Sequence, residues 1–439
     1  MQTSATMVKQ AGEGTRRYVP GLRWWIAVLL MGVTFVNYLD RTALAVVAPT
    51  LKTRLSIDEQ HYSYVLVAFQ ISYAVMQPVV GRIIDWLNLR VGLALSITWW
   101  SVAQMLAGLA GGWPAFAALR ALLGMGEAGN FPAGAKAVSQ WFRPSERTVA
   151  TGIFNMGAGL GQAIAAPLGV FLLLHYGWQS TFVVTGAIGV LWVVVWLSFY
   201  RAPEEHRWMS PAELAYVKEG QGELVVPDEA IGRAVWKVVL GRRKFWAIGV
   251  ARFLSEPAWQ LFTYWIPLYL VTERHVDLKG IAVFAWMPFV AADLGCLFGG
   301  VLSPAFLRMG ASVITARKLS ALVCALLMVN AVFISRAPSA GSAVAWFCVV
   351  TFAHQAMSST LLTLPADVFP RRAVATANGL SGTMAMVGGA IFTAVVGVVA
   401  KRSYTPLFLA ISVFDLVGTA FLWTLLRPGD LAQARPQKR

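Results

Sequence analysis

Charged residues of both signs lie inside long apolar stretches of the sequence. The first such stretch contains Asp40 and Arg41. A later one contains Arg120 and Glu127. A charge at the centre of a membrane helix costs about 2.5–3.5 kcal/mol, so such residues are kept for function or are paired with one another. A guanidinium holds a carboxylate or a phosphate through two parallel hydrogen bonds. The two arginines therefore favour an anionic substrate over a neutral one.

Structural ion pairing is the alternative interpretation of these charges. Arg120 and Glu127 are seven residues apart and share one face of a helix. If the charges only stabilise the fold, the expected ion pairs are Asp40 with Arg120, Glu127 with Arg41, and Arg252 with Glu256. Arg252 and Glu256 are one helical turn apart.

The residue spacing does not indicate an enzyme or a metal site. Cys296, Cys324 and Cys348 lie in apolar stretches, and no nucleophile–base pair or ligand cluster accompanies them. We therefore predict that the protein is not an enzyme, has no catalytic residues, and binds neither a metal nor another cofactor.

The elements that carry the charged residues are predicted to be membrane-spanning helices. Of the 439 residues, 57% are hydrophobic and 13% are charged, whereas about 25% of the residues in a soluble protein are charged. This composition excludes a soluble or disordered chain. The net charge of +15 is not gathered into a basic domain that would bind nucleic acid. A spanning helix needs about 20 mostly apolar residues. Twelve stretches meet this requirement: 24–48, 62–84, 91–112, 114–141, 147–174, 179–200, 245–271, 281–306, 315–335, 342–368, 373–399 and 405–426.

The Lys and Arg residues are distributed unevenly among the connections between spans. Most lie in the N-terminus, the even-numbered connections and the C-terminus, and few lie in the odd-numbered connections. Because cytoplasmic loops carry the excess of positive charge, both termini are predicted to be cytoplasmic. The N-terminal residues lack the short apolar core of a cleaved signal peptide, so we expect the first span to be retained. The sequence predicts a multi-pass protein of the cell inner (plasma) membrane.

A polar stretch divides the twelve spans into six and six, and the two halves resemble each other. Residues 81–90 after the second span match 300–308 after the eighth, and residues 147–151 match 372–376. Parallel repeats of this kind place a substrate site near mid-membrane between the halves. We therefore predict an all-α membrane protein of two six-helix pseudo-repeats. Its expected parts are a cytoplasmic N-terminal tail (1–23), an N-terminal six-helix bundle (24–200), a cytoplasmic linker (201–244) with a short helix that starts at Ser210-Pro211, a C-terminal six-helix bundle (245–426) and a cytoplasmic C-terminal tail (427–439).

The loop after the second span, Gly81-Arg-Ile-Ile-Asp85-Trp-Leu-Asn-Leu-Arg90, resembles a loop motif of the major facilitator superfamily. It departs from that motif at Trp86 and Asn88, where a basic residue and a glycine are usual. The resemblance implies the major facilitator fold and a gating loop formed by Gly81, Asp85 and Arg90.

Other stretches resemble the anion:cation symporter branch of that superfamily, namely residues 37–41, 120–132 and 141–147. The resemblance to bacterial hexuronate transporters implies proton-driven symport of a sugar acid, such as galacturonate or glucuronate, by alternating access. It rests on residues 252–259, 284–288, 292–296, 352–355 and 375–382.

The resemblance also implies roles for individual residues. Arg41 and Arg120 would hold the substrate. Asp40 and Glu127 would couple transport to the proton. Independently of the resemblance, Glu256 and His354 are the next candidates if neither of these acids carries the proton. The further residues expected to line the substrate cavity are Tyr38, Tyr73, Arg252 and Asn378.

Several alternatives stay open at this point. The substrate could be another organic anion, such as an aldonate, a dicarboxylate or an aromatic acid, and the coupling ion could be sodium. From other classes of protein, the rivals are a membrane-embedded enzyme and a non-transporting membrane sensor. For a transporter, the expected partners are the small organic anion, the coupling ion and the lipid bilayer. Nucleic acid is not an expected partner, and the chain is expected to act as a monomer.

Overall fold

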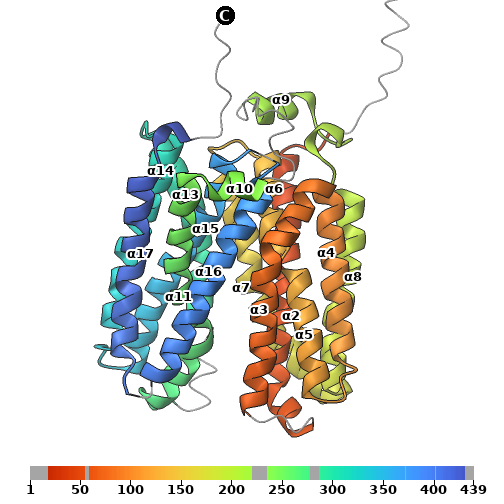
Figure 1. The fold of residues 1–439 in the computed structure, drawn as a ribbon, viewed down its shortest axis with the longest axis vertical. Coiled ribbons are helices and arrows are strands. Elements are labelled where there is room, and N and C mark those ends of the chain that lie inside the picture. The colour runs from red at the N-terminus through yellow and green to blue at the C-terminus, as the bar shows by residue number, and fades with distance from the viewer. Residues whose placement is uncertain are drawn as a thin grey trace, which may run out of the picture.

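The computed structural model describes residues 18–54, 59–219, 235–276, 286–370, 372–400 and 402–430. Every regular element in these ranges is a helix. The long helices form two bundles that lie side by side and run between the same two ends of the molecule (Figure 1). The predicted all-α fold of two six-helix halves is confirmed.

The first bundle contains the helices that correspond to the first six predicted spans. They are α2 (Leu22–Arg54), α3 (Glu59–Leu87), α4 (Leu89–Ala107), α5 (Trp113–Glu127), α6 (Asn130–Trp141), α7 (Arg147–Tyr176) and α8 (Trp178–Phe199).

The second bundle contains the helices that correspond to the other six predicted spans. They are α11 (Arg243–Thr272), α13 (Met287–Arg308), α14 (Val313–Met328) with its continuation η3 (Val329–Phe333), α15 (Ala340–Val368), α16 (Val374–Val399) and α17 (Thr405–Leu425), followed by η4 (Pro428–Asp430).

Nine helical segments of the described residues are long and apolar enough to cross a membrane. The three other predicted spans correspond to α4, to α5 with α6, and to α11. The span at 114–141 divides into α5 and α6 because Pro132 has no N–H and its ring clashes with the carbonyl of Ala128.

Short helices occupy the polar stretch between the bundles. They are η1 (Pro203–Glu205), α9 (Pro211–Glu219) and α10 (Val235–Leu240). The predicted short helix is confirmed as α9, and its start is capped by the Ser210 hydroxyl, which accepts a hydrogen bond of 3.1 Å from the Glu213 N–H. Parts of the predicted tails and linker, namely residues 1–17, 220–234 and 431–439, lie outside the described residues.

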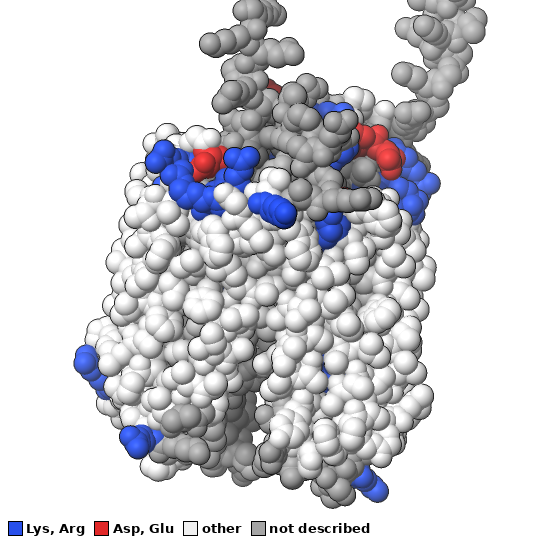
Figure 2. Space-filling view, viewed as in Figure 1, with Lys and Arg blue, Asp and Glu red and all other residues white. Residues whose placement is uncertain are grey.

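The two ends of the molecule differ in charge. Figure 2 shows Lys and Arg side chains gathered at the end where α2 begins and α17 ends, whereas the sides between the two ends are mostly uncharged. We call this end the basic end. Its charge agrees with the predicted asymmetry of the connections, and the wide uncharged band suits a bilayer.

Glycines let the two bundles meet at close range. A methyl group added at Gly152 of α7 would lie 2.5 Å from the carbonyl oxygen of Cys296 in α13. A methyl group at Gly379 of α16 would lie 2.4 Å from the carbonyl oxygen of Gln77 in α3. The two contacts are equivalent under exchange of the bundles, since α3 and α13 are each the second span of a bundle and α7 and α16 the fifth. The internal repeat seen in the sequence is therefore also a repeat of contacts.

Candidate functional site

A cavity with an empty volume of about 520 Å³ lies between the two bundles. Four of the predicted substrate-binding residues line it: Tyr38, Arg41, Tyr73 and Arg252. The other lining residues are Gln77, Phe131, Asn155, Glu256, Trp259, His354, Gln355, Ser358, Leu362, Gly382, Ala385 and Met386.

Arg41 is the main positive group that the first bundle presents to this cavity. Its Nε lies 2.6 Å from Oε2 of Glu127, which is fully buried. Its guanidinium also lies over the rings of Tyr38, Phe69 and Tyr73, at 4.9, 5.2 and 4.6 Å from their centroids. The Glu127–Arg41 pair that the ion-pair interpretation requires is thus present, at the wall of the cavity.

Asp40 and Arg120 lie behind this wall, within the first bundle. Arg120 is 3% exposed and its guanidinium lies 5.3 Å from the ring centroid of Phe69. Asp40 is fully buried, and Thr185 of α8 is its neutral neighbour. Asp40 and Arg120 both lie within electrostatic reach of Glu127. The structure therefore brings the four charges predicted from the sequence together, but Arg120 does not line the cavity.

Arg252 is the positive group that the second bundle presents to the cavity. Its Nη1 donates to the carbonyl oxygen of Asn378 at 3.2 Å and to the hydroxyl of Ser381 at 2.8 Å. Glu256, one turn along α11, accepts a hydrogen bond of 3.0 Å from Gln260. The hydrogen bonds of Arg252 thus go to neutral groups of α16. Glu256 lies within electrostatic reach of Arg252, but among the described residues no carboxylate is in direct ion-pair contact with it.

Asn378 does not line the cavity, in contrast to the prediction. Its side chain is fully buried, and only its backbone carbonyl reaches Arg252. The reason is its position at the start of α16, where that helix packs closely against α3. Asn378 therefore positions Arg252 and does not itself face the cavity.

Sequence reasoning missed several polar residues of the cavity wall. Gln77 and Asn155 are isolated polar residues in apolar stretches, Ser358 begins a short Ser-Ser-Thr run, and these were the only signals they gave. Trp259 and His354 face the cavity as a stacked pair, with ring centroids 5.7 Å apart and planes 11° apart. The wall therefore combines two guanidiniums, amide and hydroxyl groups, and an aromatic face.

The predicted gating loop joins the two bundles at the basic end. Oδ2 of Asp85 accepts hydrogen bonds from the backbone N–H and the hydroxyl of Thr376 in α16, at 2.8 and 2.7 Å. Lys136 Nζ lies 3.2 Å from Asp85 Oδ1, and a methyl group at Gly81 would lie 2.5 Å from the Ala375 carbonyl oxygen. Arg90 instead donates to the Leu197 carbonyl oxygen at 2.5 Å, within its own bundle. The contact across the bundles therefore rests on Gly81 and Asp85.

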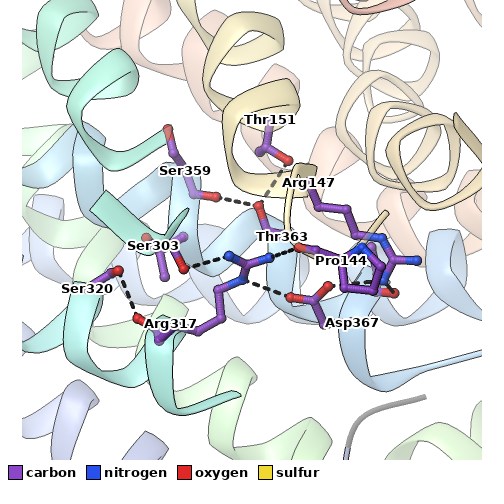
Figure 3. Close-up of polar contacts among 12 residues, drawn as sticks. Pro144, Arg147, Thr151, Ser303, Arg317, Ser320, Ser359, Thr363 and Asp367 are labelled. Carbon is purple, nitrogen blue, oxygen red and sulfur yellow. Dashed lines mark hydrogen bonds and ion pairs between the residues drawn. The ribbon is translucent and has the colours of Figure 1, made fainter. Parts of the chain in front are cut away.

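A second polar cluster joins the bundles at the same end (Figure 3). Asp367 of α15 accepts from Arg147 Nη1 of α7 at 3.0 Å and from Arg317 Nε of α14 at 2.9 Å. Arg317 also donates to the Pro144 carbonyl oxygen at 2.6 Å and to the Ser303 hydroxyl at 2.6 Å. We call these five residues the Asp367 cluster. All three charged side chains are buried, so their attraction is only weakly screened by water.

The two ends of the molecule are therefore closed to different degrees. The Asp85 contacts and the Asp367 cluster tie the bundles together at the basic end. At the opposite end, Figure 2 shows a hollow between the bundles. In this conformation the described residues seal the cavity toward the basic end.

Comparison with known proteins identifies the family. The model of the Major Facilitator Superfamily matches residues 30–393. The chain belongs to this superfamily. Two solved superfamily structures share its fold at 13% sequence identity: the proton:xylose symporter XylE, with a TM-score of 0.70 over 95% of this chain and 98% of that one, and the Escherichia coli fucose:proton symporter FucP, with a TM-score of 0.67 over 92% and 99%.

More similar sequences within the superfamily are named transporters. The hexuronate transporter of Escherichia coli K12 is 40% identical over 94% of this chain and 95% of its own length. The galacturonate transporter of Dickeya chrysanthemi is 40% identical over 71% and 90%. A D-galactonate transporter of Escherichia coli is 28% identical over 94% and 97%. This chain is accordingly a multi-pass membrane transporter of the superfamily and not an enzyme.

Proposed function

We propose that the protein is a secondary active transporter that carries a sugar acid, a hexuronate such as galacturonate or glucuronate, together with a proton, by alternating access. The observation that carries the proposal is the pair of guanidiniums, Arg41 and Arg252, that face one central cavity from the two bundles. The proteins named hexuronate and galacturonate transporters, each 40% identical to this chain, support the same substrate class.

The cavity suits an acid that is also a sugar. Arg252 offers charged donors whose current partners are neutral, so it is the better site for the substrate carboxylate, whereas the charge of Arg41 is already balanced by Glu127. The Trp259–His354 stack offers an aromatic face to a sugar ring. Amide and hydroxyl groups for the sugar hydroxyls come from Gln77, Asn155, Gln355 and Ser358.

Binding of a panel of acids tests the substrate class. We expect galacturonate and glucuronate to raise the unfolding temperature of the purified protein, because a ligand at 100 times its dissociation constant adds about 2.7 kcal/mol to stability. The matched neutral sugars, galactose and glucose, should have no effect at equal concentration. Galactonate, a dicarboxylate and an aromatic acid represent the alternative substrates. Equal stabilisation by acids and neutral sugars would contradict the role of the guanidiniums.

Proton coupling is assigned to the buried carboxylates of the first bundle. Protonation of Glu127 would weaken its 2.6 Å contact with Arg41 and change the charge that the cavity offers to the substrate. Asp40 is the second candidate, because its carboxylate is fully buried and lies within electrostatic reach of both Glu127 and Arg120. Sodium is the alternative coupling ion.

Amide variants separate coupling from binding. We expect Asp40→Asn and Glu127→Gln to lose pH-gradient-driven accumulation of the sugar acid in proteoliposomes while keeping substrate exchange in counterflow, because an amide mimics the protonated acid. Asp40→Asn is the sharper of the two, since Glu127→Gln also removes the partner of Arg41. Glu273→Gln, at an exposed position after α11, is the control. Accumulation by both amide variants with wild-type pH dependence would move the assignment to Glu256 and His354.

The difference between the two ends of the molecule supports the proposal of alternating access. The Asp85 contacts and the Asp367 cluster would hold the basic end closed while the opposite end admits substrate. Rocking of the bundles about the close glycine contacts would then open the basic end. Each chain contains its own cavity, so we propose that the monomer is the transporting unit.

The orientation in the membrane is proposed from the charge asymmetry. We place the basic end, with the N-terminus, the linker and the C-terminus, in the cytoplasm, and the protein in the inner membrane. Reporter fusions at the C-terminus and within residues 205–235 are expected to report cytoplasm. A periplasmic signal from either fusion would reverse the orientation.

A further inference from the structure

An apolar groove lies on the outside of the first bundle, away from the central cavity. It has a volume of about 750 Å³ and is formed where α2 and α8 meet near the basic end. Trp25 is 64% exposed there and Phe199 is 49% exposed. The residues that line the groove are Val19, Leu22, Trp25, Ile26, Val28, Leu29, Trp192, Phe199, His206 and Trp208.

A polar pocket of about 400 Å³ adjoins the groove. The two share Phe199, His206 and Trp208, so they form one continuous site. Arg201 and Arg207 line the pocket, together with Ser198 and Glu205. The site therefore has an apolar part beside the spanning helices and a part with two guanidiniums just beyond the end of α8.

Local hydrogen bonds fix the shape of the pocket. His206 Nε2 lies 3.0 Å from the Phe199 carbonyl oxygen and its Nδ1 accepts from the Trp208 N–H at 3.3 Å. The Val19 N–H donates to the Trp208 carbonyl oxygen at 3.1 Å, which ties the segment before α2 to this loop. The Arg207 guanidinium lies 4.6 Å from the ring centroid of Trp208. The pocket is thus built before any ligand binds.

The pocket carries an excess of positive charge. Arg201 and Arg207 face a single carboxylate, that of Glu205, among the pocket-lining residues. Burial, followed by the fields of the two arginines, lowers the pKa of His206 against the opposing effect of its bond to Phe199. The positive charge of the pocket therefore comes from the two guanidiniums, and this charge can compensate an incoming anion.

We propose that this site binds an anionic phospholipid, with its phosphate on Arg201 and Arg207 and one acyl chain in the groove between α2 and α8. Charge complementarity selects the headgroup, because basic pockets at the membrane surface attract anionic lipids and a zwitterionic headgroup offers no net charge. The apolar lining of the groove beside the spanning helices selects a lipid over a soluble phosphate. The site is separate from the substrate cavity, since the two share no lining residue.

Lipid binding to the detergent-purified full chain tests the proposal. Phosphatidylglycerol is expected to bind more tightly than phosphatidylcholine with the same chains, measured by native mass spectrometry and by the shift in unfolding temperature. Arg207→Gln is expected to weaken phosphatidylglycerol binding about fivefold, and Arg201→Gln by a similar factor, because each arginine at an anionic surface contributes about that factor. Phosphatidylcholine binding should not change.

Two controls and the choice of the test variant make the experiment specific. Arg308→Gln removes an exposed arginine from the end of α13 at the basic end and should leave lipid preference unchanged. Arg201 also donates to the Leu197 and Tyr200 carbonyl oxygens, whereas Arg207 contacts the Trp208 ring, so Arg207→Gln is the variant that removes no hydrogen bond to the backbone among the described residues of the pocket. Glycerol phosphate, which has the charge without the chains, should not bind at matched concentration. Equal binding of the two lipids, an Arg308→Gln effect as large as that of Arg207→Gln, or tight binding of glycerol phosphate would each overturn the proposal.

Discussion

Replacing Arg252 with glutamine is expected to weaken sugar-acid binding about 10- to 150-fold and to abolish measurable uptake. Hydrogen bonds to a charged group contribute about 1.5–3 kcal/mol. Arg252 faces the cavity with hydrogen bonds only to the Asn378 carbonyl and the Ser381 hydroxyl among the described residues. Its positive charge is therefore available to the substrate carboxylate. Equilibrium binding of labelled galacturonate to the purified variant is the measurement.

Two further variants separate the loss of the positive charge from the loss of a local hydrogen bond. Ser381→Ala removes one neutral partner of Arg252 and keeps the charge, so its effect should be clearly smaller. Arg252→Lys keeps the charge without the two parallel donors and should be intermediate. Wild-type affinity in Arg252→Gln, with binding lost in Arg41→Gln, would place the substrate carboxylate on Arg41 instead.

Replacing Asp367 with asparagine is expected to open the basic end. The carboxylate is the shared partner of Arg147 and Arg317. Its 3.0 Å contact with Arg147 joins the two bundles, and its 2.9 Å contact with Arg317 lies within the second bundle. Breaking a buried pair by removing one partner costs about 3–5 kcal/mol. Part of this cost is relieved when the bundles separate and water reaches the arginines. We therefore expect the conformational equilibrium to shift away from the closed basic end.

The rate of thiol labelling measures this shift of the conformational equilibrium. A cysteine in place of Thr151, which is 3% exposed and receives a 3.0 Å hydrogen bond from Thr363 across the bundles, should react faster with a maleimide when Asp367 is also replaced. The control is Glu219→Gln, because the Glu219–Arg143 pair is long, at 3.9 Å, and Glu219 is exposed. Unchanged labelling in Asp367→Asn would show that this cluster does not hold the basic end closed.

Long apolar stretches predicted nearly all of the fold, because a helix that faces lipid must be apolar along its whole length. The division of one span into α5 and α6 was present in the sequence as Pro132, but a proline alone does not say whether a helix bends or ends. The placement of Arg120 and Asn378 away from the cavity could not be predicted. Both are polar residues within predicted spans, and which face of a helix meets the cavity depends on how the bundles pack.

Some of the contacts that close the basic end could be predicted from the sequence, and others could not. Asp85 was found because it belongs to a local loop motif, whereas its partners Thr376 and Lys136 lie far along the chain. The Asp367 cluster was missed. Its members lie at the ends of separate helices, and only the approach of the two bundles brings Arg147 to Asp367.

Concentrative uptake driven by a pH gradient tests the central claim most directly. Purified protein in proteoliposomes, with the outside acidic, is exposed to labelled galacturonate and, in parallel, to labelled galactose. The account predicts that galacturonate accumulates above its external concentration, that a protonophore abolishes the accumulation, and that galactose does not accumulate. Accumulation that ignores the pH gradient and follows a sodium gradient, or equal accumulation of the neutral sugar, would contradict proton-coupled sugar-acid transport.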